Sequence, residues 1–421
     1  MVHYGCMKTK PNLLIAGASG AVSNAFLHHL ISYRNLFGKL VLVDRNKRVL
    51  EDIYIDHKRL DYTFVHTELN FYEPEKKAEY HKLLREYGIE IVLDLTDEDS
   101  LPFWHATDEL GISYINTCQN DDVIDTEETV MCVLEQRDEV KNAPHIMSSG
   151  MNPGVVNMWV RHGIEKFGVP KEIVHFEYDT SKIAKQWQPM MTWSLHEFLE
   201  ECTRDKGGLI LGRGRENIKG MYPNALEHRK SMREILSPIM KLDTYPEGTI
   251  TMHDECVSIG NKYDIPSQFL YAINPQTMQA LIKIYEEKGA VTQDDLVLGD
   301  NTNQILDGSD NIGLFLEYPD KRVYYFNTVS SVALIGTSAT MTQVIIGVFA
   351  AVFVLLFDDL DRKTYFVEEL YDTYYRHFLF DNMRVQEYVF KKGEHGHLKL
   401  TNFVPMIRSH KSKKYEHLYI I

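Results

Sequence analysis

An aromatic side chain and two carboxylates stand at helical spacing near the middle of the chain. In "TWSLHEFLEEC", Glu197 follows Trp193 by four residues and Glu201 follows it by eight. Residues at this spacing share one face of a helix, so we expect the three side chains to point the same way. The cation–π interaction between an indole face and a cation is worth about 2 kcal/mol where water is excluded. Carboxylates accept charge-assisted hydrogen bonds from ammonium groups. The pattern favours an alkyl diammonium ligand.

Two further segments carry acidic groups and a histidine that the same ligand could use. In "FEYDTS" we place Glu177 and Asp179 on opposite faces of a strand and expect at most one of them to point inward. In "MHDECVSI" we expect His253 and Glu255 on one face of a strand, with Asp254 on the other. Each of these residues, taken alone, is more often a core or solvated side chain than a ligand. The chain has no H-E-x-x-H motif, so we expect no metal site.

The segment "GASGAV" joins a strand-like run to a helix-like run and is rich in small residues. Gly17 and Gly20 would let backbone N–H groups approach a pyrophosphate at the helix start, although Ser19 stands where many dinucleotide-binding turns have glycine. The second strand ends at Asp44, whose carboxylate would bind ribose hydroxyls and repel a 2′-phosphate, which favours NAD over NADP. The neighbouring Arg45 weakens that choice, and an α/β turn without a cofactor is the alternative. The predicted cofactor-binding residues are Gly17, Ser19, Gly20, Ala21, Val22, Asp44, Arg45, Thr96, Thr117, Asn152 and Pro153.

The hydrophobic pattern places these residues on two kinds of scaffold. From residue 11 to about 145, β-branched runs alternate with helical segments, which predicts an α/β fold with a Rossmann-type doubly wound parallel sheet. From about 150 to 330, strands with few helices predict a second α+β domain with a mixed or antiparallel sheet. We divide the chain into an NAD-binding domain (1–150), a substrate and dimerisation domain (151–335), an apolar helix that returns to the first domain (336–385) and a basic, irregular C-terminal extension (386–421).

Composition narrows the class of protein. The chain has 421 residues, 44% of them hydrophobic, which is enough for two domains with their own cores. A formal net charge of −15 argues against a nucleic-acid partner and is compatible with a cationic small molecule. Five scattered cysteines and an N-terminal segment without an apolar core indicate the reducing cytoplasm. Residues 341–357 are apolar but few for a bilayer crossing, so we expect a buried helix and no membrane partner.

The order of these motifs resembles that of bacterial-type homospermidine synthases, within the wider saccharopine dehydrogenase-like group. The resemblance extends over about residues 12 to 357, and its combination of motifs is more specific than any single one. The segments that carry it are "YINTC", "NPGVV", "EYDTS", "TWSLHEF", "HDECVSI", "ILDGSDNIGLFL" and "TSATMTQVIIGVFAAV".

The resemblance implies a reaction and a set of roles. In this family NAD is a recycled hydride carrier: NAD+ oxidises putrescine to an imine, the imine exchanges with a second amine such as putrescine or spermidine and releases ammonia, and the same NADH reduces the new imine to the product. A homodimer is also implied. The implied catalytic residues are Glu177, Trp193, Glu201, His253 and Glu255, and the implied substrate contacts are Trp193, Glu201, Asp310 and Asn152.

The chain departs from the family pattern at several positions. Gln119 and Asn120 stand where the family has an acidic stretch, so one pocket carboxylate is expected to be lost. Asn274 replaces a histidine, and Asp254 replaces an asparagine between His253 and Glu255. These exchanges leave the amine substrates open.

Two other functions stay open. The first is an oxidoreductase of the saccharopine dehydrogenase type, whose carboxylated substrate would need basic groups such as Lys182, Lys185 or Arg161. The second is a degenerate NAD-binding protein without turnover, which the loss of a pocket carboxylate would favour.

Overall fold

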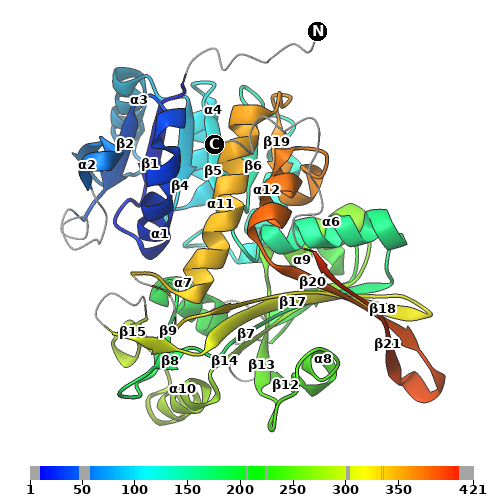
Figure 1. Cartoon of the computed structure of the whole chain (residues 1–421). Coiled ribbons are helices and arrows are strands. Elements are labelled where there is room, and N and C mark those ends of the chain that lie inside the picture. Colours follow the sequence, from blue (N-terminus) through cyan, green and yellow to red (C-terminus); the bar gives the residue numbers. More distant parts are fainter. Residues whose placement is uncertain are drawn as a thin grey trace.

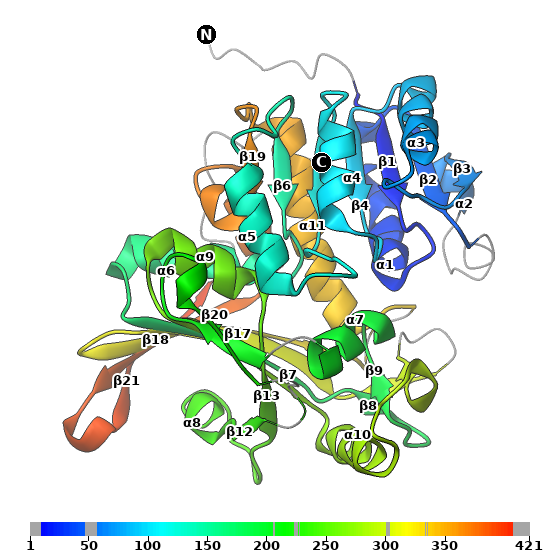
Figure 2. The same cartoon turned by 180° about the vertical axis from the view of Figure 1, so that it is seen from behind.

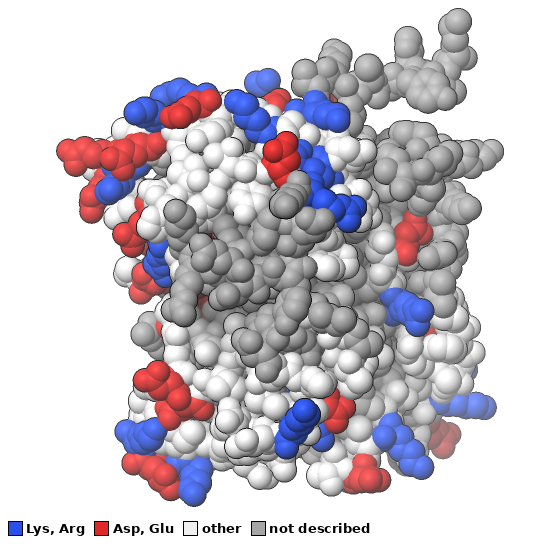
Figure 3. Space-filling view, turned by 60° about the vertical axis from the view of Figure 1, so that its left-hand side comes forward, with Lys and Arg blue, Asp and Glu red and all other residues white. Residues whose placement is uncertain are grey.

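The protein folds into two layered domains, one above the other (Figure 1). The computed structural model describes residues 10–46, 57–204, 207–222, 226, 228–299, 304–332, 334 and 336–406. On the face shown in Figure 3, acidic and basic side chains are interspersed over both domains.

The first domain is built on a parallel sheet of seven strands. Their order is β19-β6-β5-β4-β1-β2-β3, and every pair along it is parallel. The strands are β1 (Leu13–Ala16), β2 (Leu40–Asp44), β3 (Thr63–His66), β4 (Ile91–Asp94), β5 (Ser113–Asn116), β6 (His145–Met147) and β19 (Thr364–Phe366). The chain order reverses between β1 and β4, which is the position where doubly wound sheets bind ligands.

Helices cover both faces of this sheet because its strands are apolar on both sides. Within β1, Leu13 and Ile15 belong to one buried cluster, and Leu14 and Ala16 to the other. Figures 1 and 2 show the two helical layers. One contains α1 (Ala21–Leu30), α11 (Ala339–Phe357) and α12 (Tyr374–Asn382), and the other contains α3 (Pro74–Tyr87), α4 (Ser100–Asp108) and α5 (Thr126–Gln136). A short helix, α2 (His57–Leu60), precedes β3.

The second domain is a mixed sheet of ten strands. Eight follow the order β11-β10-β14-β7-β17-β18-β20-β21, and β13 pairs with β12 and β14 beside them. Only β14 and β7 run parallel; the other pairs of this sheet in the described chain are antiparallel. The strands are β7 (Glu172–Asp179), β10 (Gly207–Ile210), β11 (Ile218–Tyr222), β12 (Arg229–Ser231), β13 (Glu247–Thr251), β14 (Ser267–Ile273), β17 (Ser309–Glu317), β18 (Lys321–Ser330), β20 (Val385–Lys392) and β21 (Leu398–Met406). The predicted fold class is therefore confirmed.

Helices of the second domain lie above and below its sheet. Figure 1 shows α6 (Val155–Phe167) and α9 (Asp254–Tyr263) on the side of the first domain, and α8 (Arg233–Leu236) and α10 (Pro275–Lys288) on the other. Short strand pairs join β8 (Lys182–Ile183) to β16 (Leu306–Asp307) and β9 (Met190–Met191) to β15 (Val297–Leu298). The short helix α7 (Leu195–Leu199) lies between the domains (Figure 2).

The C-terminal segment differs from the irregular extension expected from residue 386. Strands β20 and β21 form an antiparallel hairpin, and β20 pairs with β18. Val385 and Phe390 are buried, and the Phe390 ring packs against Tyr324 on β18. These apolar contacts order a segment whose basic composition suggested otherwise. Residues 407–421 of the predicted extension lie outside the described residues.

Helix α11 is the longest apolar element. Its length and composition would suffice for a membrane crossing, but 67% of its most apolar window is buried inside the protein. Phe349 and Phe353 pack against Phe26 of α1 and Phe378 of α12. It is a buried core helix, as predicted. It begins against the second domain and runs along the first sheet (Figure 1).

Candidate functional site

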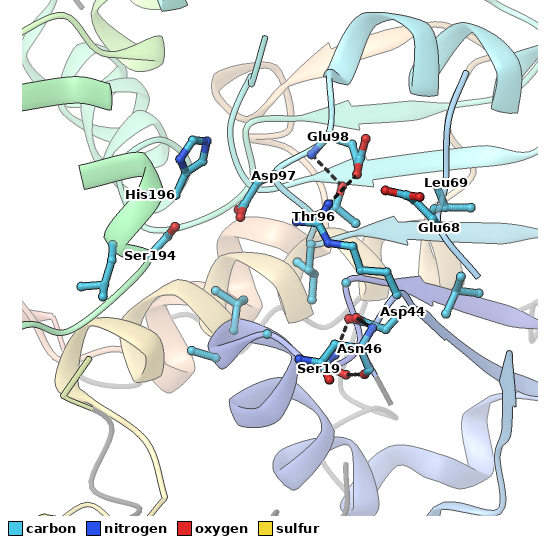
Figure 4. A pocket seen from close by; sticks show the side chains of 18 of the residues that line it. Ser19, Asp44, Asn46, Glu68, Leu69, Thr96, Asp97, Glu98, Ser194 and His196 are labelled. Carbon is cyan, nitrogen blue, oxygen red and sulfur yellow. Dashed lines mark hydrogen bonds and ion pairs between the residues drawn. The ribbon is translucent and has the colours of Figure 1, made fainter. Parts of the chain in front are cut away.

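A large open cleft lies at the carboxyl ends of β1, β2 and β4. Its volume is about 790 Å³, and it is lined by Gly17, Ser19–Val22, Asp44, Arg45 and Thr96 (Figure 4). Gly17 has φ of 72°, and a Cβ there would lie 2.3 Å from the carbonyl oxygen of Leu95. Glycine is thus required by the close approach of β1 and β4. The helix α1 then begins at Ala21, so the N–H groups of its first turn face the cleft.

Asp44 is held at the rim of this cleft by backbone donors. The N–H of Ser19 donates to Oδ2 over 2.8 Å, and the N–H of Asn46 donates to Oδ1 over 2.6 Å (Figure 4). Each oxygen keeps lone-pair capacity for a further donor, such as a ribose hydroxyl.

The lining of the cleft is acidic. Arg45 is the only Lys or Arg among the described residues that line it, and it forms a 3.7 Å ion pair with Glu98. Lys47 and Arg48 lie outside the described residues. A dinucleotide with a 2′-phosphate would enter a cleft lined by five acidic residues and one described Arg. The acidic lining residues are Asp44, Glu68, Asp97, Glu98 and Asp122.

A second, smaller cavity opens from the cleft and extends between the two domains. Its volume is about 160 Å³, and Trp193, Thr96 and Met341 line both spaces. Six carboxylate residues line it, and none of the described lining residues is Lys or Arg. The six are Asp97, Glu177, Glu197, Glu200, Glu201 and Asp254. Thr117, Asn152 and Pro153, predicted as cofactor contacts, line this cavity rather than the cleft.

Glu177 on β7 stands at the centre of a buried carboxylate group. Asn152 donates its side-chain amide to Glu177 Oε2 over 2.6 Å, and Asp310 is buried on the neighbouring strand β17. Burial, reinforced by the charge of Asp310, raises the pKa of Glu177 well above its usual value. Burial and Asp179 do the same to the pKa of Asp310. Two buried carboxyls that repel each other favour the state in which one of them holds a proton.

The expectation that Glu177 and Asp179 lie on opposite faces of the strand is wrong. Residues two apart on a strand point to the same face, and both side chains are buried. Asp179 accepts a hydrogen bond from the hydroxyl of Thr192 over 2.7 Å, and Thr340 donates to Asp310 over 2.7 Å. The two hydroxyls lie 2.7 Å apart, and since each carries one proton, a continuous hydrogen-bonded chain requires one aspartate to be protonated and to donate to its threonine.

His253 and Glu255 were expected on a strand, but they lie at the start of helix α9. His253 is the N-cap residue, and its Nδ1 lies 2.6 Å from Glu255 Oε2. Its Nε2 lies 3.5 Å from Glu201 Oε1. Burial opposes a charge on the imidazole, but Glu255 and Glu201 raise the pKa of His253 well above its usual value. The positive His253 in turn lowers the pKa of Glu255 despite burial.

Trp193 precedes helix α7 rather than lying in it. Ser194 caps α7, which ends at Leu199 and is followed by a π-helical turn from Glu200 to Arg204. Trp193, Glu197 and Glu201 nevertheless line the same cavity. The indole N–H donates to the hydroxyl of Tyr271 over 3.0 Å, which fixes the ring at the junction of the two spaces.

Sequence reasoning missed part of the cavity. Asp254, expected on the strand face opposite to His253 and Glu255, lines the cavity with His253 and accepts hydrogen bonds from Ser148 and the N–H of Gln119 over 2.8 and 2.9 Å. Burial raises the pKa of Asp254 to about 7. Asn274 lies elsewhere, where it caps α10. Two departures from the family pattern could have indicated this contact: Asp254 replaces an asparagine, and Gln119 stands where the family has an acidic stretch.

The comparisons with known proteins give fold-level likenesses of low similarity. No family model and no curated protein sequence matches the chain. A WlbA dehydrogenase from Chromobacterium violaceum, solved with NADH and UDP-GlcNAcA, is 9% identical over 77% of this chain and 76% of that chain, with a TM-score of 0.35. A short chain dehydrogenase from Leptospira borgpetersenii with bound NAD+ is 10% identical over 35% of this chain and 74% of that chain, with a TM-score of 0.24. At these TM-scores neither carries a conclusion about this chain.

Proposed function

We propose that this chain is an NAD-dependent enzyme that acts on primary amines, with the aminoalkyl-transfer chemistry of a homospermidine synthase. The observation that carries the proposal is the acidic cavity, lined by six carboxylate residues and no described Lys or Arg, that opens directly from the cleft at the switch point of the Rossmann-type sheet. A diammonium ligand needs such a lining, whereas a carboxylated ligand would be repelled by it. Lys182, Lys185 and Arg161 do not line the cavity.

The cleft fits NAD through groups on this chain. The first turn of α1 offers backbone N–H groups for a pyrophosphate, and Asp44 offers acceptors for the ribose hydroxyls. The acidic surroundings favour NAD over NADP. When bound, NAD would supply the acceptor and donor of a hydride; all binding and proton handling is left to the protein.

A diamine needs one nitrogen to stay charged and the other to lose a proton, and different carboxylates of the cavity serve the two nitrogens. The indole of Trp193 and the carboxylate of Glu201 attract a nitrogen that stays charged. A reacting amine must lose a proton, and Glu177 accepts it when its carboxylate is ionised; the raised pKa makes that carboxylate a stronger base than an exposed glutamate. Asn152 orients Glu177 through the 2.6 Å hydrogen bond.

His253 and Glu255 supply the acid for imine exchange. Glu255 and Glu201 favour the positively charged imidazole of His253. His253 can therefore donate a proton to the reacting group and take one back later in the reaction. We also propose a homodimer and a cytoplasmic location. The free thiols of Cys118, Cys132, Cys202 and Cys256 support a reducing compartment.

The deciding experiment is to incubate the purified protein with putrescine and catalytic NAD+ and to identify the amines by mass spectrometry. Homospermidine without net NADH supports the proposal. If NADH accumulates when an amino acid or another amine is supplied as the substrate, the protein is an ordinary oxidoreductase. Binding of NAD without turnover of a broad amine panel identifies a degenerate NAD-binding protein.

A further inference from the structure

His175 on β7 is a buried histidine whose ring nitrogens have no hydrogen-bond partner in the described part of the chain. The side chain is 0% exposed, and neither Nδ1 nor Nε2 is paired. Burial lowers the pKa of His175 to about 4, so the ring is neutral and carries one N–H donor and one acceptor. Leaving such a group unpaired costs about 1–3 kcal/mol.

The register of the sheet places His175 beneath the start of α9. His175 pairs with Phe269 on β14, so both side chains point to the same face. The ring of Phe269 stacks on His253, with centroids 4.3 Å apart. His175 therefore lies on the face that supports His253.

Glu255 brings a matching unpaired atom to the same place. Its Oε2 is bonded to His253, but its Oε1 is buried without a hydrogen-bond partner among the described residues. His175 and Glu255 are close enough to shift each other's pKa electrostatically. A neutral imidazole and a carboxylate oxygen, both buried and both unpaired, are the kind of polar partners that hold a buried water.

We propose that a buried water site bridges His175 to Glu255 Oε1, which makes His175 a positioning residue for the group formed by Glu201, His253 and Glu255. The water donates to Oε1 and accepts from the His175 ring. This stabilises the negative charge of Glu255 and so keeps the shared proton on His253 Nδ1. The inference concerns how this group holds its proton and does not depend on which substrate the cavity takes.

The test compares His175→Phe with His175→Gln in the full-length protein. Phenylalanine fills the space but removes both polar atoms, whereas glutamine keeps a donor and an acceptor. The first readout is the ¹⁵N chemical shift of His253. We expect His175→Phe to move Nδ1 toward its unprotonated value and His175→Gln to stay near the wild type. An unchanged His253 signal in His175→Phe overturns the proposal.

Stability and crystallography give independent readouts. If His175 were an unpaired packing residue, His175→Phe would raise the melting temperature because it removes buried unpaired groups. We expect it to fall, since Glu255 Oε1 then loses its partner, and a rise would contradict the proposal. A high-resolution crystal structure should show one water within hydrogen-bond distance of His175 and Glu255, and a dry contact there would overturn it. None of these measurements needs turnover, so the proposal can fail separately from the proposed function.

Discussion

The large cleft at the ends of β1, β2 and β4 and the smaller cavity between the domains are both lined by carboxylates, but the two regions place them in opposite electrostatic conditions. In the cleft, Asp44 lies at an open strand end and accepts hydrogen bonds from two backbone N–H groups. Glu177 lines the cavity and Asp310 is buried on the strand next to it, and burial raises the pKa of both. A carboxylate is thus suited to accepting hydrogen bonds from a ligand in the cleft and to exchanging a proton in the cavity.

The difference comes from the sheets. Parallel strands end together at one edge, so their terminal side chains meet solvent and backbone donors. The paired strands β7 and β17 instead bring Asp179 opposite Asp310 inside the domain, where water is excluded. Substitutions in the two regions should therefore separate binding of the cofactor from handling of the amine.

The largest effect is expected from Glu177→Gln. It removes the proposed base but keeps an acceptor for Asn152, so turnover should fall by at least about 100-fold while NAD affinity stays unchanged. Steady-state rates and NAD titration measure the two effects. Glu172→Gln, at the other end of the same strand and outside the cavity lining, is the control. Turnover within threefold of the wild type would remove Glu177 from the mechanism.

Trp193→Ala should weaken amine binding next most strongly. Loss of a cation–π contact of about 2 kcal/mol corresponds to a rise of about 30-fold in the amine KM. Trp193→Phe keeps an aromatic face and loses only the N–H bond to Tyr271, so its effect should be smaller. We expect NAD to remain bound in both variants. Equal amine KM in Trp193→Ala and the wild type would refute the cation–π contact.

Asp44→Ala should lower the affinity for NAD about tenfold. The substitution removes the proposed acceptor for the ribose hydroxyls and leaves the N–H groups of Ser19 and Asn46 without their carboxylate acceptor. Calorimetric titration with NAD measures the change. Glu68→Gln, which removes another charge from the same cleft, serves as the matched control. Equal losses in the two variants would show that the contact at Asp44 is not specific.

Asp254 provides a pH-dependent test. Its folded pKa of about 7 lies above the ordinary value of 3.8, so the folded protein binds this proton more tightly than the unfolded chain does. Its contribution to stability therefore falls as pH rises from about 4 to about 7. Asp254→Asn keeps an acceptor for Ser148 and Gln119 but cannot ionise. Its melting temperature relative to the wild type should rise between pH 5 and pH 8; a difference independent of pH would contradict this assignment.

The smallest effect is expected from Arg45→Ala. Its ion pair with Glu98 is largely exposed and contributes about 0–1 kcal/mol, so NAD affinity should change by less than about threefold. The affinity for NADP should fall further, since Arg45 is the only Lys or Arg among the described residues that line the cleft. Parallel titrations with NAD and NADP measure the ratio. A larger loss for NAD than for NADP would show that Arg45 binds a group common to both.

Much of the fold follows from local patterns. Continuous apolar runs such as Leu13–Ala16 and Leu40–Asp44, separated by helical segments, are typical of a parallel sheet with two covered faces. The C-terminal hairpin was not predicted, because the contact that orders it, between Phe390 and Tyr324, joins segments far apart in sequence. The start of α9 was misread as a strand for a different reason. His253 is the N-cap residue, but it has an extended backbone and makes no side-chain cap hydrogen bond, so no capping side chain marks the start of the helix.

The sequence by itself determined the two scaffolds, the small-residue turn followed by Asp44, and part of the acidic lining of the smaller cavity, because these depend on local periodicity and on composition. Only the tertiary structure decided which carboxylates meet and which of them hold protons. Asp179 and Asp310 are 131 positions apart by number, yet they pair across β7 and β17. Asp254 reaches Gln119 across the domain boundary. A pKa depends on burial and on neighbouring charges, and both are set by such long-range contacts.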